Sequence, residues 1–109
     1  MVIAFSGSRS SVSVSASSCV ATILSSVSKI KCGVVLVGCC PSGVDLLVRQ
    51  IILKSFTAWR LFSVNGQRTP EKLRARTLSM VAESEVLFSF PKSVSIIRSG
   101  TWLATFAAF

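Results

Sequence analysis

The chain has 109 residues and a net charge of +8, from 12 Lys and Arg against four Asp and Glu. This length predicts one domain with a single hydrophobic core. Half of the residues are hydrophobic, yet the most apolar runs, Gly33–Cys40 and Trp102–Phe109, are far shorter than the roughly 20 residues that span a membrane. No secretory signal is visible at the N-terminus. We therefore expect a cytoplasmic protein without a membrane partner, whose basic surface attracts phosphate groups.

The first half of the chain predicts two strands, each followed by a helix. Val2–Phe5 is a short apolar run that fits a strand, and a helix is predicted from about Val14 to Ser28, where apolar residues recur at helical spacing. Gly33–Gly38 is rich in β-branched residues and predicts a strand buried on both faces. After the turn, apolar residues recur at the spacing of an amphipathic helix; they are Val44, Leu47, Val48, Ile51 and Ile52.

The second half repeats this alternation. Trp59–Val64 predicts a third strand, and a helix is predicted to run from its cap, Thr69, to about Glu83. Val86–Phe90 predicts a fourth strand, and a last apolar helix is expected to begin near Gly100. Strands that alternate with helices indicate an α/β fold with a parallel sheet.

Small residues follow three of the predicted strands. These turns are Gly7-Ser8-Arg9, Gly38–Gly43 and Gly100-Thr101. Ligands of open parallel sheets bind beyond the carboxyl ends of the strands. The sequence therefore predicts a binding site where these turns meet.

The residue types exclude several kinds of site. The chain has no histidine, so a Ser-His-Asp or Cys-His mechanism cannot be built from it alone. Its four cysteines form no C-x-x-C pair, so neither a metal site nor a cofactor is expected. Cys39 and Cys40 lie at a predicted strand end and are interpreted as small packing residues.

Gly38–Gly43 has the G-x-x-x-x-G spacing of a P-loop. Val44 and Asp45 follow it, however, in place of the lysine and hydroxyl residue that bind phosphate and magnesium, so a nucleoside triphosphatase is not expected. The glycines still allow close approach of a ligand, Ser42 adds a hydroxyl, and a helix N-terminus favours an anion. Asp45 either stabilises the helix dipole or accepts a hydrogen bond from a ribose hydroxyl, and the spacing leaves both open.

Four segments in order, VIAFSGSR, VVLVGCCPSGVD, RARTLSMVAESEVLFSFP and SGTW, resemble the motifs of the SLOG superfamily. That superfamily includes the LOG phosphoribohydrolases and the DprA/Smf DNA-processing proteins. The resemblance covers nearly the whole chain and implies one SLOG-like domain over residues 1–109, minimal or truncated, without the usual C-terminal strand and helix. It also implies a Rossmann-like three-layer fold with a mostly parallel sheet of at least four strands, and a ligand related to nucleotides or nucleic acids.

The resemblance also implies roles for single residues. Arg76 matches the LOG arginine, Thr77 replaces the lysine that follows it, and Asp45 is the carboxylate best placed to act with Arg76 in catalysis. The LOG glutamate after Gly-Thr is absent here, which leaves open whether the chain cleaves an N-glycosidic bond. Replacing Arg76 is expected to weaken ligand binding and leave folding intact. The alternative interpretation of Arg76 is a solvated helix arginine beside Arg74, without a role in binding. The predicted phosphate-binding residues are Gly7, Ser8, Arg9, Gly38, Ser42, Gly43, Gly100 and Thr101.

Two functions of different classes follow as hypotheses. The first is binding of a nucleoside phosphate or an ADP-ribose-like ligand, as a sensor or a weak N-glycosidic-bond enzyme. The alternative is binding of single-stranded nucleic acid, as similarity to DprA/Smf implies. The apolar tail Trp102–Phe109 is expected to pack on its own core, with a homodimer seam as the other interpretation. The basic residues expected to contact nucleic acid are Arg60, Arg68, Lys72, Arg74 and Arg76.

Overall fold

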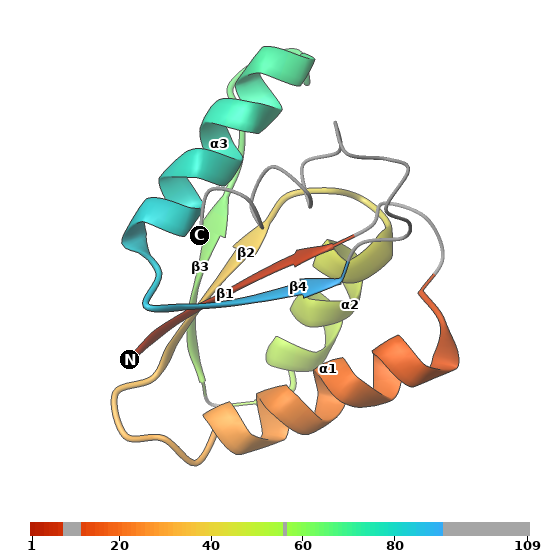
Figure 1. Ribbon diagram of the computed structural model, residues 1–109, viewed down its shortest axis with the longest axis vertical. Helices are drawn as coiled ribbons and strands as arrows, with labels where there is room; N and C mark the ends of the chain where they lie inside the picture. Colours follow the sequence, from red (N-terminus) through yellow and green to blue (C-terminus); the bar gives the residue numbers. More distant parts are fainter. Residues whose placement is uncertain (8–11, 56, 91–109) are drawn as a thin grey trace.

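Residues 1–7, 12–55 and 57–90 are described by a computed structural model of the protein. They form an α/β fold of three layers, Rossmann-like, with one sheet between helices (Figure 1). The predicted fold class is therefore confirmed. Several predictions lie outside the described residues: the roles of Ser8 and Arg9, the helix from Gly100-Thr101, and the packing of Trp102–Phe109.

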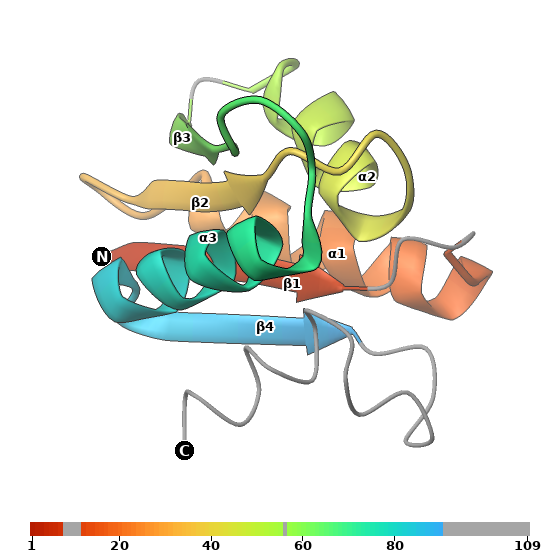
Figure 2. The same cartoon turned by 90° about the horizontal axis from the view of Figure 1, so that it is seen from above.

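The sheet has four parallel strands in the order β3-β2-β1-β4. The strands are β1 (Val2–Gly7), β2 (Val34–Gly38), β3 (Ala58–Phe62) and β4 (Val86–Phe90). Because all pairs are parallel, the four carboxyl ends lie at one edge of the sheet, and the arrows point the same way in Figure 2.

Helices cover both faces of this sheet. Helices α1 (Val14–Val27) and α2 (Gly43–Ile52) contact each other on one face, and α3 (Pro70–Glu83) packs on the other. Figure 2 shows α3 in front of the sheet and α1 behind it. No helix in this described part of the chain is long and apolar enough to cross a membrane.

The central strands carry the core on both of their faces, as predicted for β2. Val35 and Val37 belong to the cluster on the side of α1 and α2, whereas Leu36 packs with Met80 of α3. These three residues of the five in β2 are fully buried, at 0% exposure. A strand enclosed in this way reads as a continuous apolar run because neither face meets water.

The element boundaries follow capping and pairing. Thr69 caps α3, because its side chain accepts a hydrogen bond from the backbone N–H of Lys72. The third strand was predicted to reach Val64 but ends at Phe62. Phe62 pairs with Gly38, the last residue of β2. Because β2 is the only neighbour of β3 among the described strands, the ladder stops there.

Candidate functional site

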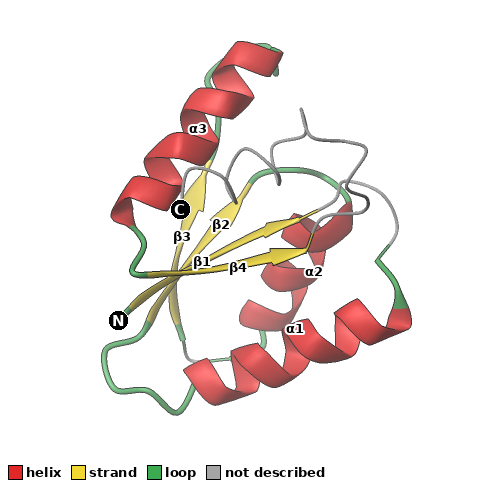
Figure 3. Cartoon of the chain, in the orientation of Figure 1, coloured by secondary structure: helices red, strands yellow, loops and turns green. Residues whose placement is uncertain are grey.

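The turn between β2 and α2 forms the centre of the candidate site (Figure 3). Ser42 is extended, with φ −146° and ψ 173°, and the chain enters the helix through Gly43 at φ +74°. That left-handed conformation suits glycine, which lacks a Cβ. Gly7 ends β1 beside this helix start, since a Cβ on Gly7 would meet the side chain of Val44. Gly7, the one described residue of the first predicted turn, thus lies beside the second.

Asp45 turns back from the first turn of α2 towards the end of β2. Its side chain is 6% exposed, and Oδ2 accepts a hydrogen bond of 3.2 Å from the backbone N–H of Cys40. The same oxygen lies 3.7 Å from Nη1 of Arg76. The roles predicted from spacing, at the helix dipole and on a ribose hydroxyl, did not include this ion pair, which joins two segments that lie far apart in the sequence.

Arg76 is buried, so the alternative of a solvated helix arginine is wrong. Its side chain is 8% exposed, and Nη1 lies 3.5 Å from Sγ of Cys39 and 3.9 Å from Sγ of Cys40. Burial lowers the pKa of Arg76, but the Asp45 carboxylate and the two cysteines raise it above its ordinary value. Nε of Arg76 is buried and has no hydrogen-bond partner within the described chain.

Gly38 makes room for this pair. A Cβ at Gly38 would meet Oδ2 of Asp45 and come within 2.7 Å of Nη1 of Arg76. The glycine predicted to let a ligand approach therefore lets Arg76 approach the backbone. Thr77, which stands where the LOG pattern has lysine, is 1% exposed and donates a hydrogen bond of 2.9 Å to the carbonyl of Leu73.

Two further arginines donate hydrogen bonds to backbone carbonyls of the β2–α2 turn. Arg49 donates to the carbonyl oxygens of Gly38 and Cys40, at 2.8 and 2.7 Å. Arg68 donates to the carbonyl of Cys39 at 2.9 Å. Sequence reasoning missed Arg49, although it follows Asp45 by four residues and so shares its face of α2. From the sequence, Arg68 is expected only among the basic residues that would contact nucleic acid.

The adjacent cysteines differ from each other. Cys40 is 4% exposed, in keeping with its interpretation as a packing residue. Cys39 is partly exposed, and its sulfur accepts contacts from Arg68 and Arg76. Burial raises the pKa of Cys39, but the two guanidiniums outweigh burial and lower it overall.

The predicted site residues thus fall into two groups. One group lies outside the described residues and consists of Ser8, Arg9, Gly100 and Thr101. The other gathers at the carboxyl edge of the sheet and consists of Gly7, Gly38, Ser42, Gly43, Asp45 and Arg76.

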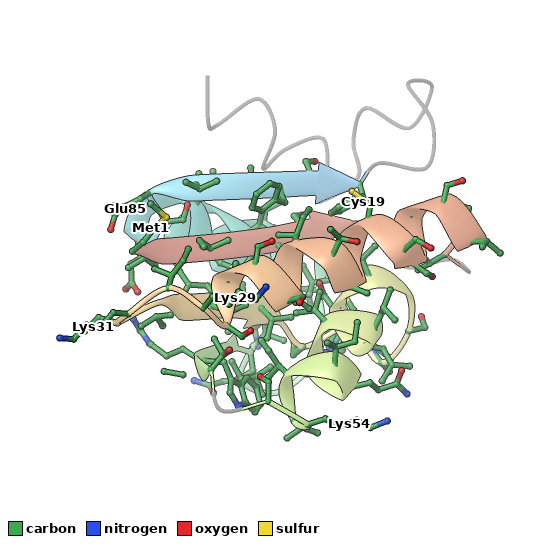
Figure 4. The ribbon with its side chains drawn as sticks, turned by 90° about the horizontal axis from the view of Figure 1, so that it is seen from below. Met1, Cys19, Lys29, Lys31, Lys54 and Glu85 are labelled. Carbon is green, nitrogen blue, oxygen red and sulfur yellow. The ribbon has the colours of Figure 1, made fainter. Side chains whose placement is uncertain are left out.

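Basic groups also occur away from this site. Lys31, for example, lies towards the same side of the molecule as Met1 and Glu85, where the strands begin (Figure 4). The carboxyl edge is therefore distinguished by its buried arginine and by the contacts among its charges. Positive charge alone does not single it out.

Comparisons with protein-family models, curated proteins and solved structures found no match. The likeness to the SLOG superfamily stays a prediction from motifs. The features that bear on function are the geometry of the β2–α2 turn and the three arginines around it.

Proposed function

We propose that the protein binds a nucleotide or nucleotide-derived ligand, a nucleoside phosphate or an ADP-ribose-like molecule, at the carboxyl edge of its sheet. The observation that carries this proposal is the buried Arg76, whose Nε has no hydrogen-bond partner within the described chain. A buried donor without an acceptor is unfavourable and rare. A phosphate oxygen is an acceptor that pairs well with a guanidinium.

The balance of charge around the turn supports an anionic ligand. Arg49, Arg68 and Arg76 contact the segment 38–40, whereas Asp45 is the one carboxylate that contacts it among the described residues. The N-terminus of α2 adjoins the same segment, and its N–H groups and dipole favour negative charge. Positive side chains and helix dipole therefore favour the same kind of ligand.

The same contacts argue against a catalytic role for Asp45. Its Oδ2 is already engaged by the N–H of Cys40 and by Arg76. A carboxylate that stabilises an oxocarbenium-like centre has to face the sugar. We therefore propose binding, with Asp45 as the residue that positions Arg76, and propose no cleavage of an N-glycosidic bond.

Ligand-dependent thermal shifts test the proposal, because a ligand of the folded state raises its apparent stability. The panel is AMP, ADP-ribose, NAD, a nucleoside triphosphate and a short single-stranded oligonucleotide, each at low and high salt. We expect a mononucleotide or ADP-ribose to raise the melting temperature at both salt concentrations.

The matched variants are Arg68→Gln and Arg74→Gln, which remove the same charge from two exposed residues. We expect Arg68→Gln to lose one hydrogen bond to the charged ligand. Such a bond contributes about 1.5–3 kcal/mol, so binding should weaken by roughly 10-fold or more. Arg74→Gln is expected to bind as the original chain does. Equal weakening in both variants, or the absence of any nucleotide shift, contradicts the proposal.

Single-stranded nucleic acid is the second candidate, because Arg68, Lys72 and Arg74 are exposed in and just before α3. Such binding falls steeply with salt as counterions are released. A shift with the oligonucleotide alone, lost at high salt and weakened alike by Arg68→Gln and Arg74→Gln, would favour this function over nucleotide binding.

A further inference from the structure

We propose that Cys39 is a nucleophilic thiolate, held by Arg68 and Arg76, and that peroxides oxidise it to a sulfenic acid. This modification site goes beyond the proposed nucleotide binding and does not depend on it. The sequence suggested only packing for this residue. The difference comes from two arginines that follow Cys39 by 29 and 37 residues in the chain.

The sulfur of Cys39 lies between two guanidiniums. Nη1 of Arg68 is 3.3 Å from Sγ, and Nη1 of Arg76 is 3.5 Å from the same atom. Arg76 is held in place by burial and by Asp45, so its charge stays beside the sulfur. Two cationic donors at hydrogen-bond distance stabilise a thiolate over a thiol.

The remaining cysteines have different surroundings. Cys40 lies beside the same two guanidiniums, 3.2 Å from Nη2 of Arg68 and 3.9 Å from Nη1 of Arg76, but it is 4% exposed, so a reagent does not reach it as it reaches Cys39. Cys19 and Cys32 are exposed, and their sulfurs make no hydrogen bond to any other described residue; Figure 4 shows Cys19 on α1. The chain thus carries two internal controls for the reactivity of Cys39.

Electrostatics favour reaction at neutral pH. Burial raises the pKa of Cys39. The hydrogen bond and charge of Arg76 and the charge of Arg68 have the opposite effect and outweigh burial, so the pKa is lowered overall. Each tenfold gain in thiolate fraction reduces intrinsic nucleophilicity only about threefold. The net effect on rate is therefore an increase.

The oxidation step balances with a peroxide as the oxidant. The thiolate sulfur of Cys39 attacks one oxygen of hydrogen peroxide, an S–O bond forms and the O–O bond breaks. The sulfur loses two electrons and the peroxide gains them. The hydroxide that leaves takes a proton from solvent and becomes water, and Cys39 becomes a sulfenic acid.

The first experiment uses the unmodified chain and a limiting amount of iodoacetamide at pH 7. Fragmentation mass spectrometry assigns the alkylated residue over time, since Cys32, Cys39 and Cys40 share one tryptic peptide. We expect Cys39 to react faster than Cys19 and Cys32 in the folded protein, by about threefold for each tenfold gain in its thiolate fraction. In denaturant the three rates are expected to become equal. Equal rates in the folded protein would overturn the proposal.

A pair of variants then tests the arginine contact. Arg68→Met removes one guanidinium from the sulfur, and Arg74→Met removes the same charge from an exposed position in α3. We expect Cys39 to react several-fold more slowly in Arg68→Met and at an unchanged rate in Arg74→Met. A uniform effect of both variants, or none, would contradict the role of Arg68. If Arg68→Met does not fold, the comparison of Cys39 with Cys19 and Cys32 in the unmodified chain still tests whether Cys39 is the more reactive thiol.

Dimedone, which traps sulfenic acids, tests the oxidation itself. After a short exposure to hydrogen peroxide, the adduct is expected on Cys39 ahead of Cys19 and Cys32. An adduct spread evenly over all exposed cysteines would overturn selective oxidation. Nucleotide binding is measured without an oxidant, so its failure and the failure of this proposal are separate results.

Discussion

The guanidinium of Arg76 and the carboxylate of Asp45 lie 3.7 Å apart, with side chains only 8% and 6% exposed. From the sequence, Arg76 is expected to be replaceable without loss of folding. Burial changes that expectation, because removing one partner leaves the other charge uncompensated inside the protein. At the scale of the residue, the candidate ligand-binding group is also a structural one.

We therefore predict that Arg76→Met lowers the free energy of unfolding by about 3–5 kcal/mol. The double variant Arg76→Met/Asp45→Asn is expected to lose less than the sum of the two single variants, because neither charge remains unpaired. Arg60→Gln is the control: Arg60 pairs with Glu83 at 2.6 Å, but their side chains are 59% and 46% exposed. Exposed pairs contribute about 1 kcal/mol or less. Urea denaturation in which Arg76→Met costs no more than Arg60→Gln would refute the prediction.

At the scale of the element, the β2–α2 turn depends on its backbone as well as on its side chains. Gly43 enters α2 at φ +74°, where a side chain is strained. We predict that Gly43→Ala lowers the free energy of unfolding by about 1–2 kcal/mol. Gly33→Ala is the matched control, because Gly33 is outside the left-handed region and a Cβ there would have its nearest neighbour at 3.4 Å. Thermal unfolding that ranks the two variants in the opposite order would contradict this account.

The elements themselves were largely predictable from local sequence. The buried run of β2, the spacing of apolar residues in α2 and the Thr69 cap of α3 are encoded by neighbouring residues, and the structure confirms all three. The ion pair of Asp45 with Arg76 was not predictable, because spacing along the chain does not reveal which side of α3 faces the end of β2. The contrast between Cys39 and Cys40 was not predictable either, because both sulfurs lie beside Arg68 and Arg76 and differ in exposure, which depends on how the turn packs.

At the scale of the whole molecule, the titration of Cys39 links stability to pH. The pKa of Cys39 is lowered in the folded protein, whereas the thiol of an unfolded chain has a pKa of about 8.5. Between these two values the unfolded chain binds more protons than the folded one, so stability rises with pH. The contribution is fully present above the unfolded value and is lost as pH falls through the folded pKa.

We predict that the stability advantage of the original chain over Cys39→Ser grows with pH across this window and is constant above it. Denaturation at several pH values between 6 and 9 measures it, and Cys19→Ser serves as the control because Cys19 is exposed on α1. An advantage that does not vary with pH, or that shrinks as pH rises, would show that no thiolate is stabilised by folding.

The strand order has a consequence for synthesis of the chain. Strand β1 is made first, yet Ile3 pairs with Val35 on one side and with Val86 on the other. As the chain emerges from a ribosome, β1, β2 and β3 are available while β4 is still missing, so one edge of β1 has open backbone hydrogen-bonding groups. Asp45 likewise lacks its ion pair with Arg76 until Arg76 has been released. The described sheet is therefore completed only once β4 has been released, and Asp45 gains its ion pair only once α3 has been released.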